Sequence, residues 1–210
     1  MKIRRLENSG RIYSSNVYLI MGDWKRIADL NTLVDVGSDP AILDHLERIN
    51  PGAGKRKIDQ VVLTHSHFDH TSLLPMIRER YQPKVFAFSP FMTGIDHVLE
   101  QGQHIWIGDR DFEVIHIPGH SMDSIALFNE DEGVLFVGDS PVVVNSSDGG
   151  HEEGFVLALC DICQRNVNKI YFGHGDPILK EARSLLNGSL ANARKANGQK
   201  KHAVRGNNQL

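Results

Sequence analysis

Hydrophobic residues along this chain fall into short runs separated by polar turns, and their spacing alternates between a strand period and a helix period. Runs of strand length, several of them rich in β-branched residues, predict strands within five segments. These segments are residues 11–22, 31–38, 57–65, 84–89 and 168–177. Two longer stretches, 102–120 and 124–140, alternate apolar and polar residues around the turns "GDR" and "EDEG", and they predict hairpins.

Amphipathic stretches between these segments predict helices. They lie within residues 38–52, 71–81, 152–166 and 177–196. The first helix has the clearest boundaries, with Asp39 as its expected N-cap, Pro40 at the first helical position and a Pro-Gly pair at its end. Asn187 and Gly188 mark a point at which the last helix is open to interruption.

The order of elements is typical of a layered α/β sandwich, in which two sheets stack face to face and helices cover their outer sides. A doubly wound sheet is the alternative. The length fits one domain, which we expect to span residues 1–196. Residues 197–210 are polar and basic without periodicity, so we expect a disordered C-terminal tail there.

Composition narrows the possible partners. The 210 residues carry a formal net charge of −3, so no overall basic field favours nucleic acid or anionic lipid. The apolar stretch "NVYLIM" is too short for a signal-sequence core or a membrane span. We therefore expect a cytoplasmic protein with a small-molecule substrate and with no nucleic-acid or membrane partner. Nothing in the pattern predicts an oligomeric state.

The two cysteines, Cys160 and Cys163, are three residues apart in a predicted amphipathic helix. Residues at this spacing share a helix face, where cysteine usually packs as a small apolar side chain. A redox or metal role is the alternative for this pair. Two cysteines cannot complete a four-ligand zinc site by themselves.

The segment "THSHFDH", residues 64–70, presents His65, His67, Asp69 and His70 directly after a β-branched strand. Residues two apart on a helix point about 200° apart, so a helix cannot aim His65 and His67 at one centre. A loop that leaves a strand can do so. Imidazole and carboxylate groups gathered in such a loop indicate a metal site.

Three further candidate ligands lie far along the chain. His120 in "IPGHS", Asp139 in "LFVGDS" and His174 in "YFGHGDP" each follow an apolar strand and adjoin glycine, which lets the backbone approach a site closely. If these strand ends meet at one sheet edge, they complete the cluster that residues 65–70 begin. His151 lies in a loop and is open to a substrate role. The other histidines are expected in ordinary surface or core positions: His45, His97, His104, His116 and His202.

In this order and spacing, "THSHFDH", "PGHS", "GDS" and "GHGDP" resemble the metallo-β-lactamase superfamily, and "SSNVYLI" and "LVDVGSD" match its opening strands. The resemblance covers roughly residues 10–180 and implies a four-layer αββα sandwich. It also implies two metal positions. The first would be bound by His65, His67 and His120, the second by Asp69, His70 and His174, and Asp139 would bridge them.

The implied ligand set suits zinc, iron or manganese. An all-histidine first position favours zinc, whereas the greater oxygen character of the second also suits iron or manganese. Asp35 occupies the position of a structural aspartate in the family, and we expect it to brace neighbouring groups rather than to bind metal.

The resemblance implies hydrolysis by a hydroxide held between two metal ions. Asp69 would orient this nucleophile and accept its proton while it also binds the second metal. The chain is similar to small thioester and lactone hydrolases such as glyoxalase II, so we expect an ester, thioester or lactone substrate. Only residues 175–210 follow His174, so a dedicated glutathione-binding domain is not expected. The segment "GDSPVVVN" lacks the tyrosine that quorum-sensing lactonases carry after the bridging aspartate.

Two other functional classes stay open: an oxidoreductase and a metal-bound scaffold without catalysis. A persulfide dioxygenase of this fold binds one iron through positions that match His65, His120 and Asp139. A flavodiiron oxygen reductase fits less well, because position 67 is histidine rather than a carboxylate. A metal-bound scaffold without catalysis is the second open class. We expect the substrate pocket to be built by residues 21–26, 89–98 and 142–153, whose mixed side chains indicate a neutral or weakly anionic ligand of modest size.

Overall fold

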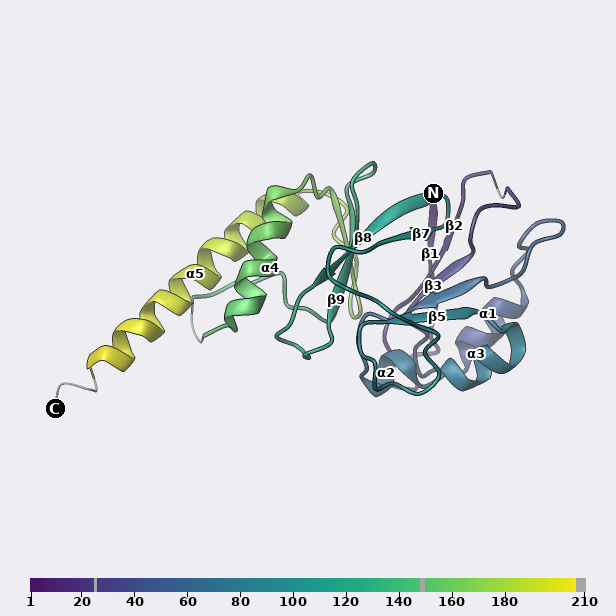
Figure 1. The fold of residues 1–210 in the computed structure, drawn as a ribbon, viewed down its shortest axis with the longest axis horizontal. Coiled ribbons are helices and arrows are strands. Elements are labelled where there is room, and N and C mark those ends of the chain that lie inside the picture. The colour runs from purple at the N-terminus through teal and green to yellow at the C-terminus, as the bar shows by residue number, and fades with distance from the viewer. Residues whose placement is uncertain (25, 148–149, 207–210) are drawn as a thin grey trace.

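The computed structural model describes residues 1–24, 26–147 and 150–206. Two β-sheets form the centre of this part of the chain, and helices lie on their outer sides (Figure 1). The first sheet has six strands in the order β1-β2-β3-β4-β5-β6. They are β1 (Lys2–Leu6), β2 (Val17–Met21), β3 (Thr32–Val34), β4 (Gln60–Val62), β5 (Lys84–Ala87) and β6 (His97–Val98).

The second sheet has five strands in the order β11-β10-β9-β8-β7. They are β7 (His104–Ile107), β8 (Arg110–His116), β9 (Ile125–Asn129), β10 (Val134–Gly138) and β11 (Lys169–Phe172). Strands β3 to β6 run parallel to one another, and so do β10 and β11. The remaining neighbours pair antiparallel.

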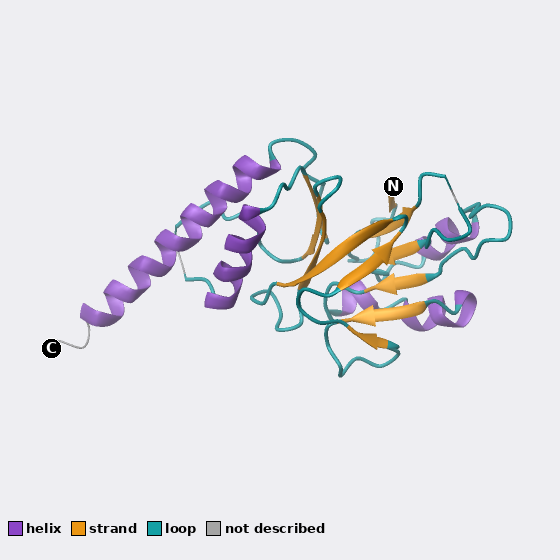
Figure 2. Ribbon diagram, turned by 45° about the horizontal axis from the view of Figure 1, so that its top comes forward, coloured by secondary structure: helices purple, strands orange, loops and turns teal. Residues whose placement is uncertain are grey.

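Helices cover both outer faces, which confirms the predicted αββα sandwich. The first group is α1 (Ala41–Glu47), α2 (Phe68–Thr71) and α3 (Leu74–Tyr81), and the second is α4 (Glu153–Gln164) and α5 (Ala182–Gly206). Figure 2 shows the strands between these two groups, with α5 extending past the second sheet.

Three apolar layers hold the sandwich together. One lies between the first sheet and helices α1 and α3, where Leu33 and Val61 meet Ile42 and Ile77. Another lies between the second sheet and helices α4 and α5. The third lies between the sheets and includes Phe112. The strands facing two apolar layers are buried on both sides, which explains why segments such as 134–138 are continuously apolar.

The predicted strands and hairpins are confirmed, with shorter boundaries. The first predicted helix begins at Ala41 with Pro40 as its N-cap, so the predicted start, with Asp39 as N-cap, is corrected by one residue. The buried carboxylate of Asp39 still accepts a hydrogen bond from the Ala41 amide at 3.0 Å. Strand β1 was not predicted. Its residues are mostly exposed and basic, as suits an edge strand, so they lack the apolar alternation that would reveal it.

The C-terminal prediction is corrected for residues 197–206. Helix α5 runs without interruption through Asn187 and Gly188 to Gly206, whereas a disordered tail was expected from residue 197. Lysine, glutamine and alanine favour helix, and adding residues to an existing helix needs no new nucleation. Residues 207–210 lie outside the described part. Within that part, no helix combines the length and the apolar character needed to cross a membrane.

Candidate metal centre

The carboxyl ends of four strands bring the predicted ligands to one edge of the sandwich. In the first sheet, β4 leads into His65. In the second, β8, β10 and β11 run in the same direction and lead into His120, Asp139 and His174. A backbone hydrogen bond links the two sheets at this edge: the Ile125 amide donates to the Thr64 carbonyl at 2.9 Å.

Three histidines form the first group of candidate ligands. His65, His67 and His120 each offer a ring nitrogen, and these atoms lie within 4.8 Å of one another. His120 Nε2 and His67 Nδ1 are 2.9 Å apart. The His65 ring is buried whereas the other two are exposed, so the group opens to solvent on one side.

Two carboxylates and two histidines form the second group. Asp69, His70, Asp139 and His174 also offer ligand atoms within 4.8 Å of one another. His174 Nε2 lies 2.8 Å from Asp69 Oδ2 and 3.4 Å from Asp139 Oδ2. Asp139 Oδ2 is also 3.6 Å from His120 Nε2, so this carboxylate lies between the two groups. The structure therefore brings all seven predicted residues together.

Asp35 supports the ligands from behind, as the sequence predicted. Its buried carboxylate accepts hydrogen bonds from the Thr64 amide and the Thr64 hydroxyl, each at 2.8 Å. The same carboxylate also contacts His70, with Asp35 Oδ2 lying 2.8 Å from His70 Nδ1. Asp35 itself has a φ of 58°, a left-handed conformation that aspartate tolerates better than most residues.

These contacts occupy the Nδ1 atoms of two buried histidines, His65 and His70, and leave their Nε2 atoms for the cluster. The Thr64 hydroxyl donates to Asp35, so its oxygen accepts from His65 Nδ1 at 3.2 Å, which leaves a lone pair on His65 Nε2. His65 Nε2 is buried without a hydrogen-bond partner among the described residues, whereas the buried His70 Nε2 and Asp139 Oδ1 face each other at 3.2 Å. A buried ring nitrogen is costly when unpaired, and the other two atoms are ligand types beside it, so the three fit a divalent cation. Imidazole with carboxylate is a donor set for zinc, iron or manganese.

The carboxylates and imidazoles of the cluster shift one another's pKa values. Burial lowers the pKa of His70, but Asp35 and Asp139 outweigh it and raise that pKa to about 10. Burial and the neighbouring His70 lower the pKa of His65 to about 4. Although burial opposes it, the hydrogen bond and charge of His70 lower the pKa of Asp139. The Asp35 and Asp139 carboxylates therefore favour a positive charge at this position of the cluster.

Two glycines make room for this arrangement. A Cβ atom on Gly173 would lie 2.1 Å from Asp139 Oδ1 and 2.6 Å from His70 Cε1. At Gly138, which has a φ of 53°, a Cβ atom would lie 2.5 Å from Thr64 Oγ1. Such distances are too short for real Cβ contacts, so the strand ends approach the ligands only because these side chains are absent.

Tyr13 is a site residue that sequence reasoning missed. Its ring stacks on the His174 imidazole with centroids 4.9 Å apart, and its hydroxyl lies 3.3 Å from His174 Nε2. Partial burial and the charges of Asp69 and Asp139 raise the pKa of Tyr13, which keeps the hydroxyl protonated. The two rings are 161 residues apart in sequence, so no local spacing signals their contact.

The residues expected outside the cluster lie outside it. His151 packs against Phe155, and its backbone amide and carbonyl bond to the Asn197 side chain at 2.8 and 3.0 Å. The described side chains of the other histidines have separate partners or positions: His45 on α1, His97 on Phe86, His104 on Asp111 and His116 on Phe88. The side chain of His202 lies outside the described part. Cys160 and Cys163 are free thiols packed against the apolar layer of the second sheet.

A cavity of about 280 Å³ borders the cluster. It is lined by His120, Asp139 and His174 together with the apolar side chains of residues 141–143 and Phe172. A second, larger cavity involves Met92 and Thr93. Parts of two predicted pocket loops, 89–98 and 142–153, therefore line cavities, and their role in binding the substrate stays a prediction. In the third predicted loop, Asp23, Trp24 and Arg26 line a separate cavity. This loop precedes the amino end of β3 whereas Asp35 follows its carboxyl end, so the expectation that it borders the site is corrected.

The chain belongs to the metallo-beta-lactamase superfamily, because residues 10–141 match the model of that family. A solved structure that it resembles is the metallo-beta-lactamase family protein TTHA1429 from Thermus thermophilus. The TM-score is 0.66 at 20% sequence identity, and the likeness covers 92% of this chain and 79% of that one.

Curated relatives include enzymes that act on thioesters according to their names. An atrochrysone carboxyl ACP thioesterase of Cryptosporiopsis is 27% identical over 169 residues, which cover 76% of this chain and 52% of the relative. A hydroxyacylglutathione hydrolase of Chromohalobacter salexigens is 30% identical over 115 residues, which cover 54% of this chain and 43% of the relative. This chain thus spans about half the length of these relatives.

Proposed function

We propose that this protein is a metal-dependent hydrolase that cleaves an ester, thioester or lactone with two divalent ions bound. The observation that carries the proposal is the convergence of seven ligand-type side chains in two groups, with the buried His65 Nε2 lacking a hydrogen-bond partner among the described residues. Zinc is the first candidate, with iron or manganese as alternatives. His65, His67 and His120 would hold one ion, Asp69, His70 and His174 the other, and Asp139 would contact both.

Bound divalent ions lower the pKa of water toward about 7 and polarise a substrate carbonyl group. The residues of the chain would then orient the reactants. Asp69 is partly exposed beside His174, where its carboxylate can hold the attacking water and accept its proton. The oxygen of water adds to the carbonyl carbon, the C–S or C–O bond breaks, and the thiol or alcohol leaves with a proton. The Tyr13 hydroxyl lies 3.3 Å from His174 Nε2, and we propose that it donates a hydrogen bond to the substrate.

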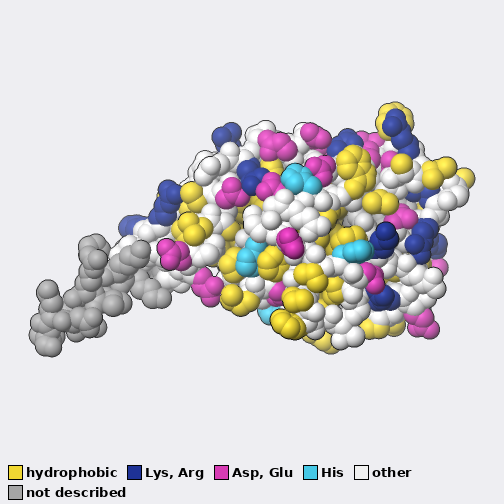
Figure 3. Space-filling model, in the orientation of Figure 1, with side chains coloured by type: hydrophobic (Ala, Val, Ile, Leu, Met, Phe, Trp, Pro, Cys, Tyr) yellow, Lys and Arg dark blue, Asp and Glu magenta, His cyan; other side chains and the backbone are white. Residues whose placement is uncertain are grey.

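A small neutral molecule fits the surroundings better than a polyanion. The cavity beside the cluster combines its polar ligands with Pro141, Val142, Val143 and Phe172. On the face seen in Figure 3, basic and acidic side chains are interspersed, which gives no single-sign field for steering nucleic acid. The thioesterase and hydroxyacylglutathione hydrolase relatives support a thioester as the first substrate to try.

A hydrolysis panel on zinc-, iron- and manganese-loaded protein tests the proposal. We expect cleavage of at least one thioester, ester or lactone. His120→Ala should lose activity by about a hundredfold or more, because a ligand of the reacting centre is gone. The matched control is His104→Ala, an exposed histidine outside the cluster, which should retain activity. Retained activity in His120→Ala would refute the assignment of this ligand.

The competing function is a persulfide dioxygenase that uses one iron at His65, His120 and Asp139. It predicts a single iron per chain and oxygen uptake with glutathione persulfide. We expect neither, since Asp69, His70 and His174 offer a second set of ligands. Oxygen uptake by the one-iron protein, together with no hydrolysis in the panel, would contradict the proposed function.

A further inference from the structure

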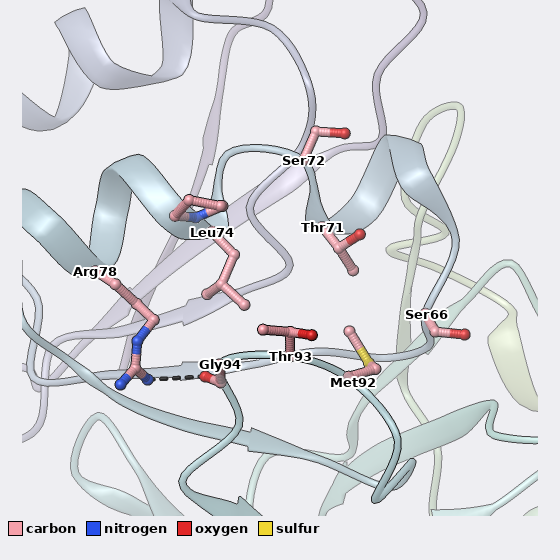
Figure 4. Close-up of a pocket in the computed structure, with 9 residues that line it drawn as sticks. Ser66, Thr71, Ser72, Leu74, Arg78, Met92, Thr93 and Gly94 are labelled. Atoms are coloured by element: carbon pink, nitrogen blue, oxygen red, sulfur yellow. Dashed lines mark hydrogen bonds between the residues drawn. The ribbon is translucent and has the colours of Figure 1, made fainter.

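A cavity of about 590 Å³ opens directly from the ligand loop, on the side of helices α2 and α3. Its volume lies within the range of pockets that bind small molecules. One end is lined by Ser66, which lies in the chain between the candidate ligands His65 and His67. The other end is lined by Arg78 and Gly94, as Figure 4 shows. The cavity therefore runs from the ligand loop toward α3.

The wall between these ends is largely apolar. Leu74 is almost fully buried, and Met92 packs partly against the apolar layer under the first sheet. In Figure 4 both side chains point into the space between α3 and the 92–94 segment, with Thr93 between them. Pro75 completes this wall. A ligand seated here would exchange water for hydrocarbon contacts, which favours an apolar chain.

No free charge is available in this cavity to bind an ionic ligand. The Arg78 guanidinium donates two hydrogen bonds to the Asp96 carboxylate, at 2.8 and 3.1 Å, and a third to the Gly94 carbonyl at 2.8 Å. Its charge is therefore compensated. The Thr71 hydroxyl donates to the His67 carbonyl at 3.0 Å, so this polar group is also occupied. A carboxylate or phosphate placed here would lose hydration without gaining an unpaired cation.

Two exposed aromatic side chains adjoin lining residues of the cavity in the chain. Phe68 is 75% exposed and lies in the chain between two lining residues, Ser66 and Thr71. Phe91 is 93% exposed and directly precedes Met92. Large apolar side chains exposed beside a cavity are typical of a ligand-binding groove.

We propose that this cavity binds the acyl chain of the substrate, which makes the substrate an ester or thioester of a linear, uncharged acyl group. The inference rests on the proposed hydrolase function and specifies its substrate class. With the chain along Leu74 and Met92, the proposal puts the reacting carbonyl at the Ser66 end, next in the chain to the candidate ligands His65 and His67. The 280 Å³ cavity shares no lining residue with this one, and it is left for the thiol or alcohol part.

Filling the cavity tests the proposal. Thr93 is exposed, so Thr93→Trp adds an indole at the cavity without disturbing the buried core. The matched control is Glu79→Trp, which puts the same side chain on an exposed position of α3 that does not line the cavity. Both variants and the wild type are assayed with thioesters of one thiol, from acetyl to decanoyl.

We expect kcat/KM of the wild type to rise by about tenfold or more from acetyl to octanoyl, because each buried methylene adds favourable transfer free energy. Thr93→Trp should lower the octanoyl-to-acetyl ratio by a similar factor, whereas Glu79→Trp keeps the wild-type ratio. A flat chain-length profile, or an equal ratio in all three proteins, would overturn the proposal.

A binding measurement separates this inference from the proposed function. An octyl thioether analogue, which cannot be hydrolysed, is titrated by calorimetry into each zinc-treated protein. We expect binding to the wild type and to Glu79→Trp, and about tenfold weaker binding to Thr93→Trp. If the panel shows no hydrolysis but this pattern holds, the hydrolase function fails and the chain-binding cavity stands. Equal binding by Thr93→Trp rejects the cavity whatever the activity.

Discussion

The candidate metal ligands in this protein are oriented by hydrogen bonds from neighbouring buried residues. The Asp35 carboxylate fixes Thr64 and His70, and Thr64 in turn fixes the hydrogen on His65. The identities of the seven candidate ligands were predictable, because imidazole and carboxylate groups after apolar strands form a recognisable pattern. Tyr13 was not predictable, because a stacking contact over such a sequence separation leaves no periodicity.

Replacing Asp35 with asparagine tests this support. Asn also tolerates the left-handed backbone found at residue 35, so the fold should be kept. The neutral amide no longer holds His70 Nδ1 as a carboxylate does, so we expect metal affinity to fall by about 10- to 100-fold. Competition titration with a chelator measures the change, and Asp44→Asn on the exposed surface of α1 is the control. Unchanged affinity in Asp35→Asn would show that Asp35 has no influence on the ligands.

Strand ends are the elements that assemble the site. The periodicity of residues predicted β4, β8, β10 and β11, since buried strands and hairpins have clear apolar patterns. It could not predict which ends meet, because that depends on pairing between distant strands. For the same reason, the loop at residues 21–26 was wrongly expected near the site: its polar character was visible in sequence, but its sheet edge was not.

Two glycine-to-alanine substitutions test whether the metal ligands need the β11 backbone to approach them closely. One adds a methyl group beside the ligands, and the other adds the same group far from them. Gly173→Ala puts a carbon 2.1 Å from Asp139 Oδ1, and we expect it to displace this ligand and abolish stoichiometric metal binding. Gly188→Ala adds the same group in open space on helix α5 and should raise the free energy of unfolding by about 0.5–1 kcal/mol. Denaturant unfolding and metal titration measure the two effects. Normal metal binding by Gly173→Ala would refute the tight approach of β11.

The start of helix α1 gives a pH-dependent contribution to stability. Burial opposes the charge of Asp39, but hydrogen bonds from Ser9 and from the Ala41 amide lower its pKa overall. A lowered folded pKa stabilises the protein above the unfolded pKa of about 4, and this contribution is lost as the pH falls through the folded value. Asp39→Asn should therefore cost about 2 kcal/mol at pH 7 and progressively less below pH ~4, as followed by urea unfolding. An equal cost at both pH values would contradict this account.

At the scale of the whole molecule, the αββα sandwich places one edge of each sheet side by side, and the site lies where they meet. The alternation of strands and helices predicted this layering, because each sheet needs an apolar cover on both faces. The prediction of a disordered tail was wrong for residues 197–206, which belong to α5. The helical tendency of such a polar segment depends on the helix that precedes it.

Metal stoichiometry tests the central claim most directly. Metal-free protein is titrated in turn with zinc, iron and manganese, and bound metal per chain is measured after gel filtration. The account predicts two ions per chain for at least one of these metals, and fewer than two for Asp139→Ala, whose carboxylate lies between both groups. Failure of the wild type to retain any of the three metals stoichiometrically, or retention of only one ion per chain, would contradict it.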